Sequence, residues 1–303
     1  MKLIKAAIVY KATIPTNIFA LHEHLLEFPF AECLDLQMRS AGFVPPHEED
    51  GPALVREFPG GFAFRVRIDD KIIPAQAVKA EIDKRVKAIK ENEGRKPGKK
   101  ELADIKGQVM LDLCRRALVK TTASLTCFYD TASGYLIVPT SSKKIADVCT
   151  SLLVQAVGSV KTETLKVANV KHGLTTRMKS WLDDNEDAFG AFQPCDDVAM
   201  AAEGRKIYAK MSDLQQARKG LTEALAKGFD VESIGFHFTG VDFRLSSDFH
   251  LKGVSFAEHE IPEEEENLWA ADAAMQVKKV VCVVDELAAM LTYKDAAEEG
   301  GAA

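Results

Sequence analysis

The chain has 303 residues, of which 47% are hydrophobic and 28% are charged, and its formal net charge at pH 7 is −6. This is the balance of an ordinary soluble globular protein, and the length suggests about two domains. No apolar run approaches the roughly 18 residues that a membrane helix needs, which excludes a helical membrane protein.

The first apolar stretch and the cysteines indicate a cytoplasmic protein. Residues 6–10 form an apolar stretch that ends at Lys11, too short for the hydrophobic region of a signal peptide, so we expect a buried first strand. The 6 cysteines include no pair at CxxC spacing. Scattered thiols of this kind suit a reducing compartment, where they pack as small core residues. We therefore expect neither a disulfide framework nor a structural zinc site.

The first third of the chain alternates strand and helix signals. Apolar residues recur at helical spacing near its start, and a later stretch alternates apolar with basic residues, which places Arg65 and Arg67 on the exposed face of a strand. In chain order we expect a strand, an amphipathic helix, a loop with Pro and Gly, a second strand and a turn, at residues 2–10, 15–28, 41–52, 62–68 and 69–70.

A helical hairpin is expected next, over residues 74–120. Apolar residues recur every three or four positions between 78 and 89, and the helical pattern is interrupted at 92–100 by Gly and Pro. A second helix follows, and its last turns carry cations, as the helix dipole prefers: Arg115, Arg116 and Lys120. Two helices with narrow apolar stripes and a basic loop are typical of a projecting arm, inserted into a larger domain.

The remainder of the chain mixes strand meanders with helices. The expected elements are a hairpin (124–130 and 135–140), a helix (142–158), a strand (204–210), a helix (214–228), a meander of strands (232–256), a helix (261–275), a strand (277–284) and a final helix (285–294). This mixture predicts an α+β fold of several lobes with mixed or antiparallel sheets. We divide the chain into a central α+β domain (1–73 and 121–165), the arm (74–120) and a C-terminal α+β domain (166–303).

Charge is distributed unevenly along this acidic chain. Residues 71–120 hold 14 Lys or Arg against 7 Asp or Glu, whereas residues 257–303 hold 12 acidic against 3 basic residues. The loop of the arm, residues 94–100, contains no acid, and further cations lie on the expected strands at 65–67 and 204–210. Such an uneven distribution of charge is informative about the binding partners of a protein.

These cations favour a nucleic-acid contact over a solvated surface with no further role. Lys and Arg that bind backbone phosphates give affinity without sequence readout, and nothing in the chain resembles a recognition helix. Aromatic residues are absent from the arm, which disfavours a stacking platform for single strands there. We predict non-specific binding of double-stranded DNA by Lys79, Lys84, Arg85, Lys87, Lys90, Arg95, Lys96, Lys99, Lys100, Arg115, Arg116, Lys120, Arg205, Lys206 and Lys210.

Two alternatives to DNA binding stay open at this point. Charged helix faces are often only solvated surface, and a basic arm also suits a protein-interaction module that docks on an acidic partner. The acidic C-terminal segment of a second copy of this chain is one such partner.

No recognised motif for catalysis is present. Residues 94–100 resemble a phosphate-binding loop, but three residues separate the glycines instead of four, and no Ser or Thr follows the Lys. His22 and His24 diverge by roughly 200° on a helix and cannot share a metal ion. The acidic pairs at 183–184 and 196–197 are more typical of caps and surface than of a catalytic metal site. We expect a binding protein without metal or cofactor, with a metal-dependent nuclease as the least favoured alternative.

Several motifs, in the same order, resemble those of the RdgC family, the recombination-associated nucleoid proteins of bacteria. The most specific block is "DTASGYLIV" at 130–138 followed by "SKKIADVCTSLLVQAVGS" at 142–159. The resemblance covers nearly the whole chain, and its other motifs are "GFVPP" (42–46), "KIIP" (71–74), "AK" (209–210) followed by Asp213-Leu214, and "ELAAML" (286–291).

The resemblance implies a homodimer closed into a ring, with a positively charged hole wide enough for duplex DNA. It further implies DNA binding without strong sequence preference, restraint of the loading of RecA-type recombinases, no catalysis, and a nucleoid-associated location in the cytoplasm. The hairpin is similar to the family's projecting arm, and residues 115–118 are similar to the contact region at its base, with Leu118 as a dimer contact. Arg205 and Lys210 are similar to the family's basic strand.

Overall fold

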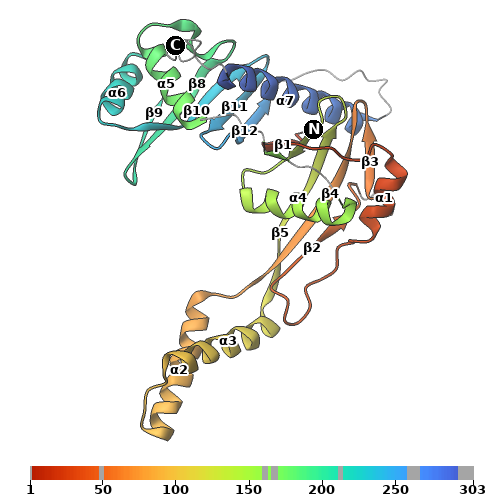
Figure 1. Cartoon of the computed structure of the whole chain (residues 1–303), viewed down its shortest axis with the longest axis vertical. Helices are drawn as coiled ribbons and strands as arrows, with labels where there is room; N and C mark the ends of the chain where they lie inside the picture. The colour runs from red at the N-terminus through yellow and green to blue at the C-terminus, as the bar shows by residue number, and fades with distance from the viewer. Residues whose placement is uncertain are drawn as a thin grey trace, which may run out of the picture.

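A computed structural model describes residues 2–47, 51–158, 163–164, 170–210, 214–257 and 267–292 of the chain. The fold is α+β, as expected: helices pack on a large antiparallel sheet whose strands come from both halves of the chain (Figure 1). In these ranges no helix combines the length and the apolar character that crossing a membrane requires.

Within the described residues, one sheet of 12 strands runs through the molecule, and its named strand pairs are antiparallel. Across the sheet the order is β2 (Arg39–Val44), β4 (Gly61–Ile72), β5 (Leu118–Asp130), β6 (Tyr135–Val138), β1 (Ala6–Lys11), β12 (Leu251–Phe256), β11 (Val241–Ser246), β10 (Asp230–Phe238), β8 (Gln193–Ala202) and β9 (Arg205–Lys210). Off this path, β3 (Val55–Phe58) pairs with β4 and β7 (Glu163–Thr164) pairs with β1. The N-terminal strand β1 therefore joins the two halves of the sheet.

Alternation along the strands sorts side chains onto two faces of the sheet. In β1, Ile8 and Tyr10 belong to one apolar cluster, whereas Ala7 and Val9 belong to another. The helices over the first cluster are α1 (Ile18–Leu26) and α4 (Lys143–Val157). Those over the second are α5 (Val170–Leu182), the short helix η2 (Glu186–Phe189), α6 (Leu214–Ala226) and α7 (Leu268–Thr292).

In the part of the chain that the structure describes, helices cover one face of the C-terminal half of the sheet. Apolar side chains of β8 to β12, such as Met200, Phe236 and Leu245, contribute to the cluster under α5, α6 and α7. Among the described residues, those of β8 to β12 are absent from the cluster under α1 and α4. We call the uncovered face of β8–β12 the open sheet face.

The C-terminal helix α7 packs against strands from both halves. The Gln276 side-chain oxygen accepts a hydrogen bond from the backbone N–H of Ile4 at 3.1 Å. The Tyr135 hydroxyl donates to Asp285 at 2.7 Å, and burial, together with this carboxylate, raises the pKa of Tyr135 to about 12. The domain boundary expected at 165/166 lies outside the described residues, so the division into domains stays a prediction.

Two helices, α2 (Ala75–Glu93) and α3 (Lys99–Arg116), form an arm that projects from the sheet (Figure 1), as the helical repeats predicted. Gly94 ends α2 in the left-handed region at φ 68°, where a residue without a Cβ has no steric penalty. Ile105 and Val109 of α3 are buried against α2. This small core holds the pair together.

The arm is inserted between β4 and β5, whose ladder runs from the Gly61–Asp130 pair to the Ile72–Leu118 pair. Near the sheet the residues of this two-stranded ribbon are buried, and toward the arm those of β5 become exposed. Backbone hydrogen bonds, more than apolar packing, therefore carry the connection to the arm.

Polar contacts from the loop before β2 support the root of the arm. Lys71 is 9% exposed, and its ammonium donates to the carbonyl oxygens of Leu34 and Asp35, each at 2.7 Å. Arg39 forms a two-bond contact with the Asp70 carboxylate, which lowers the pKa of Asp70. The neighbouring loop is thereby tied to the last residues of β4.

The prediction of a strand at 277–284 is wrong, because this stretch lies inside α7. Its valines are β-branched, which favours a strand when the stretch is considered alone. In the structure Val277, Val280, Val284 and Leu287 are all buried, at the three- and four-residue spacing of one helix face. Packing on the sheet overrides the local preference.

The prediction of a turn at Asp69-Asp70 is also wrong, because β4 continues through both residues to Ile72. The Asp69 carboxylate accepts two hydrogen bonds from Arg67, and this contact satisfies a charge that is otherwise unfavourable in a strand. Arg67 is therefore used within the strand, with its guanidinium 4.4 Å from the centre of the Phe30 ring.

Two further boundaries differ from expectation. Residues 41–44, expected in a loop, belong to β2. Lys120, expected in the last turn of a helix, belongs to β5 opposite Asp70, because α3 ends at Arg116. The acidic stretch 258–266, part of the helix expected at 261–275, lies outside the described residues.

Replacing Lys71 by Met should destabilise the fold, because the change leaves two carbonyl groups without their donor in a half-buried position. We expect a loss of about 1–3 kcal/mol in the free energy of unfolding, measured by urea denaturation. The matched control is Lys79→Met on the exposed side of α2, which should stay within about 0.5 kcal/mol of the parent protein. Equal stability of the two variants would contradict this role of Lys71.

Candidate nucleic-acid interface

The first helix of the arm has an apolar side and a basic side. The apolar residues between positions 78 and 89 are partly buried, as their spacing predicted. Lys79, Lys87 and Lys90 are exposed. At 100° per residue these three lysines fall within roughly 80° of one another, so they form one basic strip along α2.

Two arginines of the arm hold its parts together. Arg85 of α2 donates to the Asp112 carboxylate of α3 at 2.7 Å, and this hydrogen bond lowers the pKa of Asp112. Arg95 donates to both carboxylate oxygens of Glu101, at 2.7 and 2.9 Å, and to Glu93 at 2.7 Å. Their charges are compensated inside the arm, so both arginines stabilise the hairpin whatever else they bind.

The lysine side chains of the arm form weak ion pairs or, among the described residues, none. Lys84 lies 3.9 Å from Glu81 and Lys87 lies 3.7 Å from Glu91, both as exposed contacts along one helix. Such exposed ion pairs contribute little to the stability of a helix. In the part of the arm that the structure describes, the side chains of the other expected contact residues form no hydrogen bond or ion pair: Lys79, Lys90, Lys96, Lys99, Lys100, Arg115, Arg116 and Lys120.

The edge strand β9 places two lysines on the open sheet face. Ile207 packs toward the core under α6 and α7, so Lys206 and Lys210 point to the opposite face. Lys206 contacts the Glu232 carboxylate at 2.7 Å, whereas Lys210 has no ion pair among the described residues. Arg205 alternates with Lys206 and shares the face of Ile207. The strand therefore divides its cations between the two faces.

Lys210 begins a row of charged residues across the open sheet face. It lies opposite Asp197 of β8, and Asp197 contacts Arg244 of β11 at 3.2 Å. Arg244 in turn lies directly opposite Lys252 of β12. The row holds three cations and one acid, so it carries a net positive charge.

Sequence reasoning missed three of the cations on this side: Arg244, Lys252 and Lys143. Burial lowers the pKa of His250, Asp248 opposes this effect, and Lys252 and Lys143 lower the pKa further, so their charges lie near this ring. Lys252 belongs to β12 and Lys143 begins α4, and both are exposed. Only strand pairing and helix placement bring these residues together, so no local sequence signal identifies them.

The regions that carry these cations border one concave side of the molecule. Figure 1 shows the C-terminal half of the sheet at one end, α4 in the middle and the arm at the other end. The helices α5, α6 and α7 lie over the other face of β8–β12, away from this side. The concave side therefore combines the open sheet face with exposed lysines and lacks a covering helix in the described structure.

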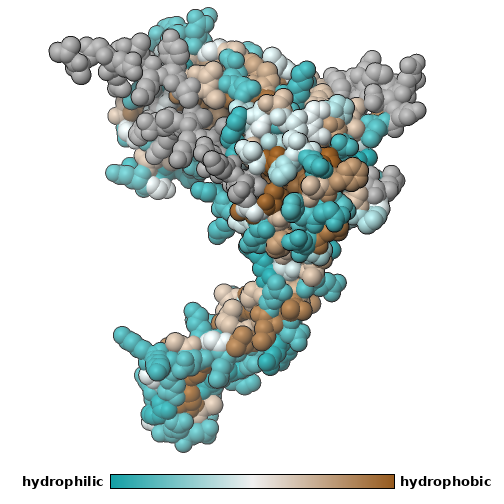
Figure 2. All heavy atoms as spheres, turned by 45° about the vertical axis from the view of Figure 1, so that its right-hand side comes forward, coloured by the Kyte–Doolittle hydropathy of each residue, from teal (hydrophilic) through white to brown (hydrophobic). Residues whose placement is uncertain are grey.

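A second surface, apolar in character, lies where the arm leaves the body. Leu118 is 80% exposed, and it pairs across the ladder with Ile72, which is also exposed. Val119 and Leu111 are exposed nearby in the chain. Figure 2 shows hydrophobic side chains along the arm near its junction with the body. Exposed apolar side chains that gather in this way are typical of protein–protein contact sites.

Comparison with known proteins agrees with the motifs of the chain. The model of a family described as "Putative exonuclease, RdgC" matches residues 3–294. The chain belongs to the RdgC family. Relatives named "Recombination-associated protein RdgC" include one from Neisseria meningitidis serogroup C (strain 053442), 27% identical over 282 residues that cover 90% of this chain and 92% of the relative.

Two other relatives with the same name extend the comparison. The protein from Neisseria gonorrhoeae (strain NCCP11945) is 26% identical over 281 residues, covering 89% of this chain and 91% of the relative. The protein from Salmonella paratyphi B (strain ATCC BAA-1250 / SPB7) is 24% identical over 276 residues, covering 89% and 88%. The family resemblance is confirmed, and the RdgC relatives are named for recombination.

The word exonuclease in the RdgC family description directs attention to the acidic pairs of the chain. Asp184 contacts Arg218, and Asp197 contacts Arg244. The side chain of Asp196 lies outside the described residues. Within the described ranges, no group of three or more His, Cys, Asp and Glu residues is arranged to hold a metal ion.

The contact between Arg85 and Asp112 predicts that the arm loosens in acid. Because Arg85 lowers the pKa of Asp112, the contact stabilises the folded arm above the usual carboxyl pKa of about 3.9 and disappears as pH falls through the lower folded value. We expect amide hydrogen exchange to be slower in α2 and α3 of the parent protein than in an Arg85→Gln variant at neutral pH, and equal in acid. A difference that persists once the pH is well below the lowered pKa of Asp112 would contradict this assignment.

Proposed function

We propose that this protein binds DNA without sequence specificity and that two copies close into a ring around the duplex. The observation that carries the proposal is the location of exposed cations on the arm and on the open sheet face, around one concave side. The helices α5, α6 and α7 and the larger apolar core lie on the opposite face of β8–β12. A cation-bearing concave surface suits a polyanion that passes along it.

The cations without internal partners are the ones that support phosphate binding. A lysine in an internal ion pair must give up that contact before it binds a phosphate, whereas an unpaired lysine only exchanges its counterion. Lys90 of the arm, Lys210 of β9 and Lys252 of β12 are exposed and lack an ion pair within the described structure. The RdgC chain presents these charges on elements without a recognition helix, which favours backbone contacts over base readout.

The apolar surface at the base of the arm supports a homodimer. One copy of the chain forms an open shape, so a second copy is needed to enclose a duplex. Leu118 and Ile72 offer a patch that each copy presents to the other in a two-fold interface. Ring closure through the arms would place both sets of cations around the same hole.

The names of the relatives support a role of the proposed activity in recombination. A ring around duplex DNA covers the phosphate backbone that a RecA-type recombinase also needs. We therefore infer that this protein restrains the loading of such a recombinase, with duplex DNA and the recombinase both found at the nucleoid in the cytoplasm.

Two other functions make different predictions about the purified protein. A module that docks its basic arm on an acidic protein needs that partner, so it predicts no saturable binding to duplex DNA. An exonuclease, as the family description has it, predicts Mg²⁺-dependent release of nucleotides from a labelled DNA end. We propose binding without cleavage, and nucleotide release by the purified protein would overturn that part.

Removal of three unpaired lysines should reduce the salt dependence of duplex binding. We expect a Lys90→Gln, Lys210→Gln, Lys252→Gln variant to lower the magnitude of the slope of log affinity against log salt by about 0.9 for each phosphate that is no longer neutralised, roughly 2.7 units for each copy and about twice that for a ring of two copies. Fluorescence anisotropy of a labelled duplex across a salt series measures the slope. The matched control is Lys219→Gln, Lys227→Gln, Lys278→Gln, which removes the same charge from exposed positions on α6, after it and on α7. Equal slopes for the two variants would contradict the proposed surface.

Replacement of Leu118 by Asp should weaken the dimer without unfolding the chain, because this side chain is largely exposed in the single copy. Burying a carboxylate in an apolar interface is unfavourable. We expect analytical ultracentrifugation to give a dimer for the parent protein and a monomer for Leu118→Asp. Phe19→Asp, at an exposed position on α1, is the control and should stay dimeric. A dimeric Leu118→Asp variant would place the interface elsewhere.

A further inference from the structure

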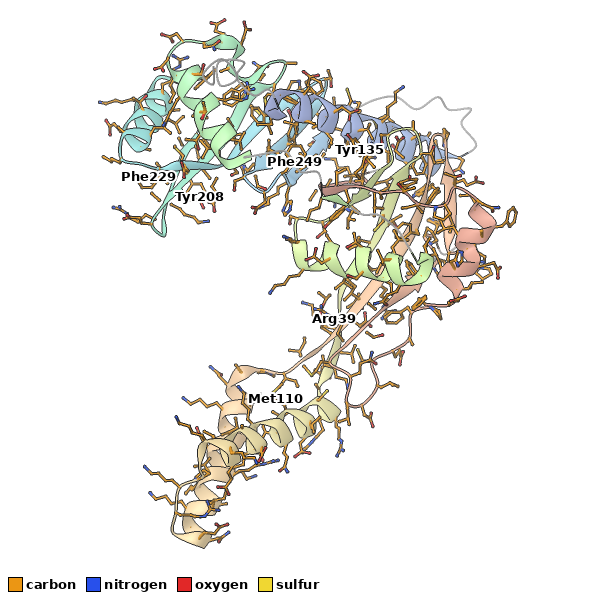
Figure 3. All side chains as sticks on the ribbon, in the orientation of Figure 1. Arg39, Met110, Tyr135, Tyr208, Phe229 and Phe249 are labelled. Atoms are coloured by element: carbon orange, nitrogen blue, oxygen red, sulfur yellow. The ribbon has the colours of Figure 1, made fainter. Side chains whose placement is uncertain are left out.

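Tyr208 is an exposed aromatic residue on the proposed DNA-binding side. It is 70% exposed, whereas Tyr10, Tyr129 and Tyr135, the other tyrosines in the described part of the chain, are buried. Figure 3 shows it on β9, at the end of the sheet that lies across from the arm. An aromatic ring left in water at the centre of a strand loses the free energy of apolar burial. A ligand that covers the ring would recover it.

The alternation of β9 places Tyr208 between two lysines. Because Ile207 packs toward the core, Tyr208 shares the open sheet face with Lys206 and Lys210, two positions away on either side. The residue directly opposite on β8 is Ala199, whose methyl group is too small to cover an aromatic ring. The ring therefore offers a flat apolar surface with a cation on each side along the strand.

We propose that Tyr208 stacks on an unpaired DNA base, so that β9 forms a contact for single-stranded DNA. An aromatic ring beside cations is the combination that holds single strands: the cations bind the backbone, and the ring accepts any base. Lys210 has no ion pair among the described residues, and Lys206 shares its charge with Glu232. Bases inside a duplex already stack on each other, so this contact requires a single strand, a gap or a frayed end.

The same observations disfavour a protein strand as the occupant of this edge. β9 is the last strand of the sheet, and its free edge could in principle pair with another strand. Lysines at alternate positions of an edge strand are a common way to prevent such pairing. Lys is also depleted in protein–protein interfaces. A nucleic acid is the ligand that the lysines attract and that the ring accepts.

This inference rests on the proposed DNA-binding function and adds the form of DNA that one residue recognises. The test uses the full chain, a labelled oligo-dT strand and a blunt duplex. We expect Tyr208→Ala to weaken binding of oligo-dT by about 5- to 150-fold and binding of the duplex by less than about twofold. Tyr208→Phe keeps the ring and should bind both like the parent protein. Phe19→Ala removes an 86% exposed ring from α1 and is the matched control.

Stacking also has a spectroscopic readout that loss of folding cannot imitate. An oligo-dT strand with one 2-aminopurine base should lose fluorescence on binding to the parent protein and to Tyr208→Phe, but not when Tyr208→Ala is saturated. Because Tyr208 carries no charge, the salt slope of Tyr208→Ala should match the parent slope.

The failures of the two proposals are distinguishable. Equal weakening of oligo-dT and duplex binding by Tyr208→Ala, or no weakening of either, overturns the stacking contact and leaves the proposed duplex binding intact. A parent protein that binds neither DNA overturns the proposed function and the inference together.

Discussion

The β4–β5 ladder is the interaction on which the shape of the molecule depends. Its pairing continues from the body as far as Ile72 and Leu118, so two hydrogen-bonded strands carry the arm instead of a flexible linker. Near the arm, the ribbon has few buried apolar side chains on β5, so polar contacts stabilise it instead. Arg39 binds Asp70, and Lys71 binds carbonyl groups of the neighbouring loop. The position of the arm is therefore set by hydrogen bonds and charges at its root.

In the described structure, helices cover one face of β8–β12, which explains how an acidic chain exposes cations on the other face of these strands. The strands β8 to β12 alternate, and their apolar side chains meet α5, α6 and α7, which leaves their polar side chains on the open sheet face. There Arg244 lies opposite Lys252, and like charges in that arrangement weaken a sheet by up to about 1 kcal/mol. Asp197 contacts Arg244, and Lys252 has no ion pair within the described residues. A sheet that retains this repulsion suits an external anion that relieves it.

The sequence periodicities predicted the arm and much of the sheet, since both follow from local spacing. The repeat of apolar residues and the position of Gly94 predicted where α2 ends. The prediction of a strand at 277–284 failed because periodicity alone does not separate a helix from a strand over a short apolar stretch. The site was harder to predict. Arg85 and Lys90 are both cations of the same predicted helix, and the sequence does not distinguish their roles. In the structure, Arg85 is bound to Asp112 on another helix. Only the packing register between helices decides which cation is free.

This distinction between paired and unpaired cations makes the proposed polyanion binding compatible with a net charge of −6. At about 0.1 M salt the Debye length is about 10 Å, so acids elsewhere in the chain act only weakly on a phosphate at the concave side. A lysine such as Lys206, already bound to Glu232, exchanges one ion pair for another when it meets a phosphate. Lys210 and Lys90 release counterions without breaking an ion pair first. The proposed affinity for DNA therefore depends on the local pattern of unpaired cations, and the total charge of the chain is a poor guide to it.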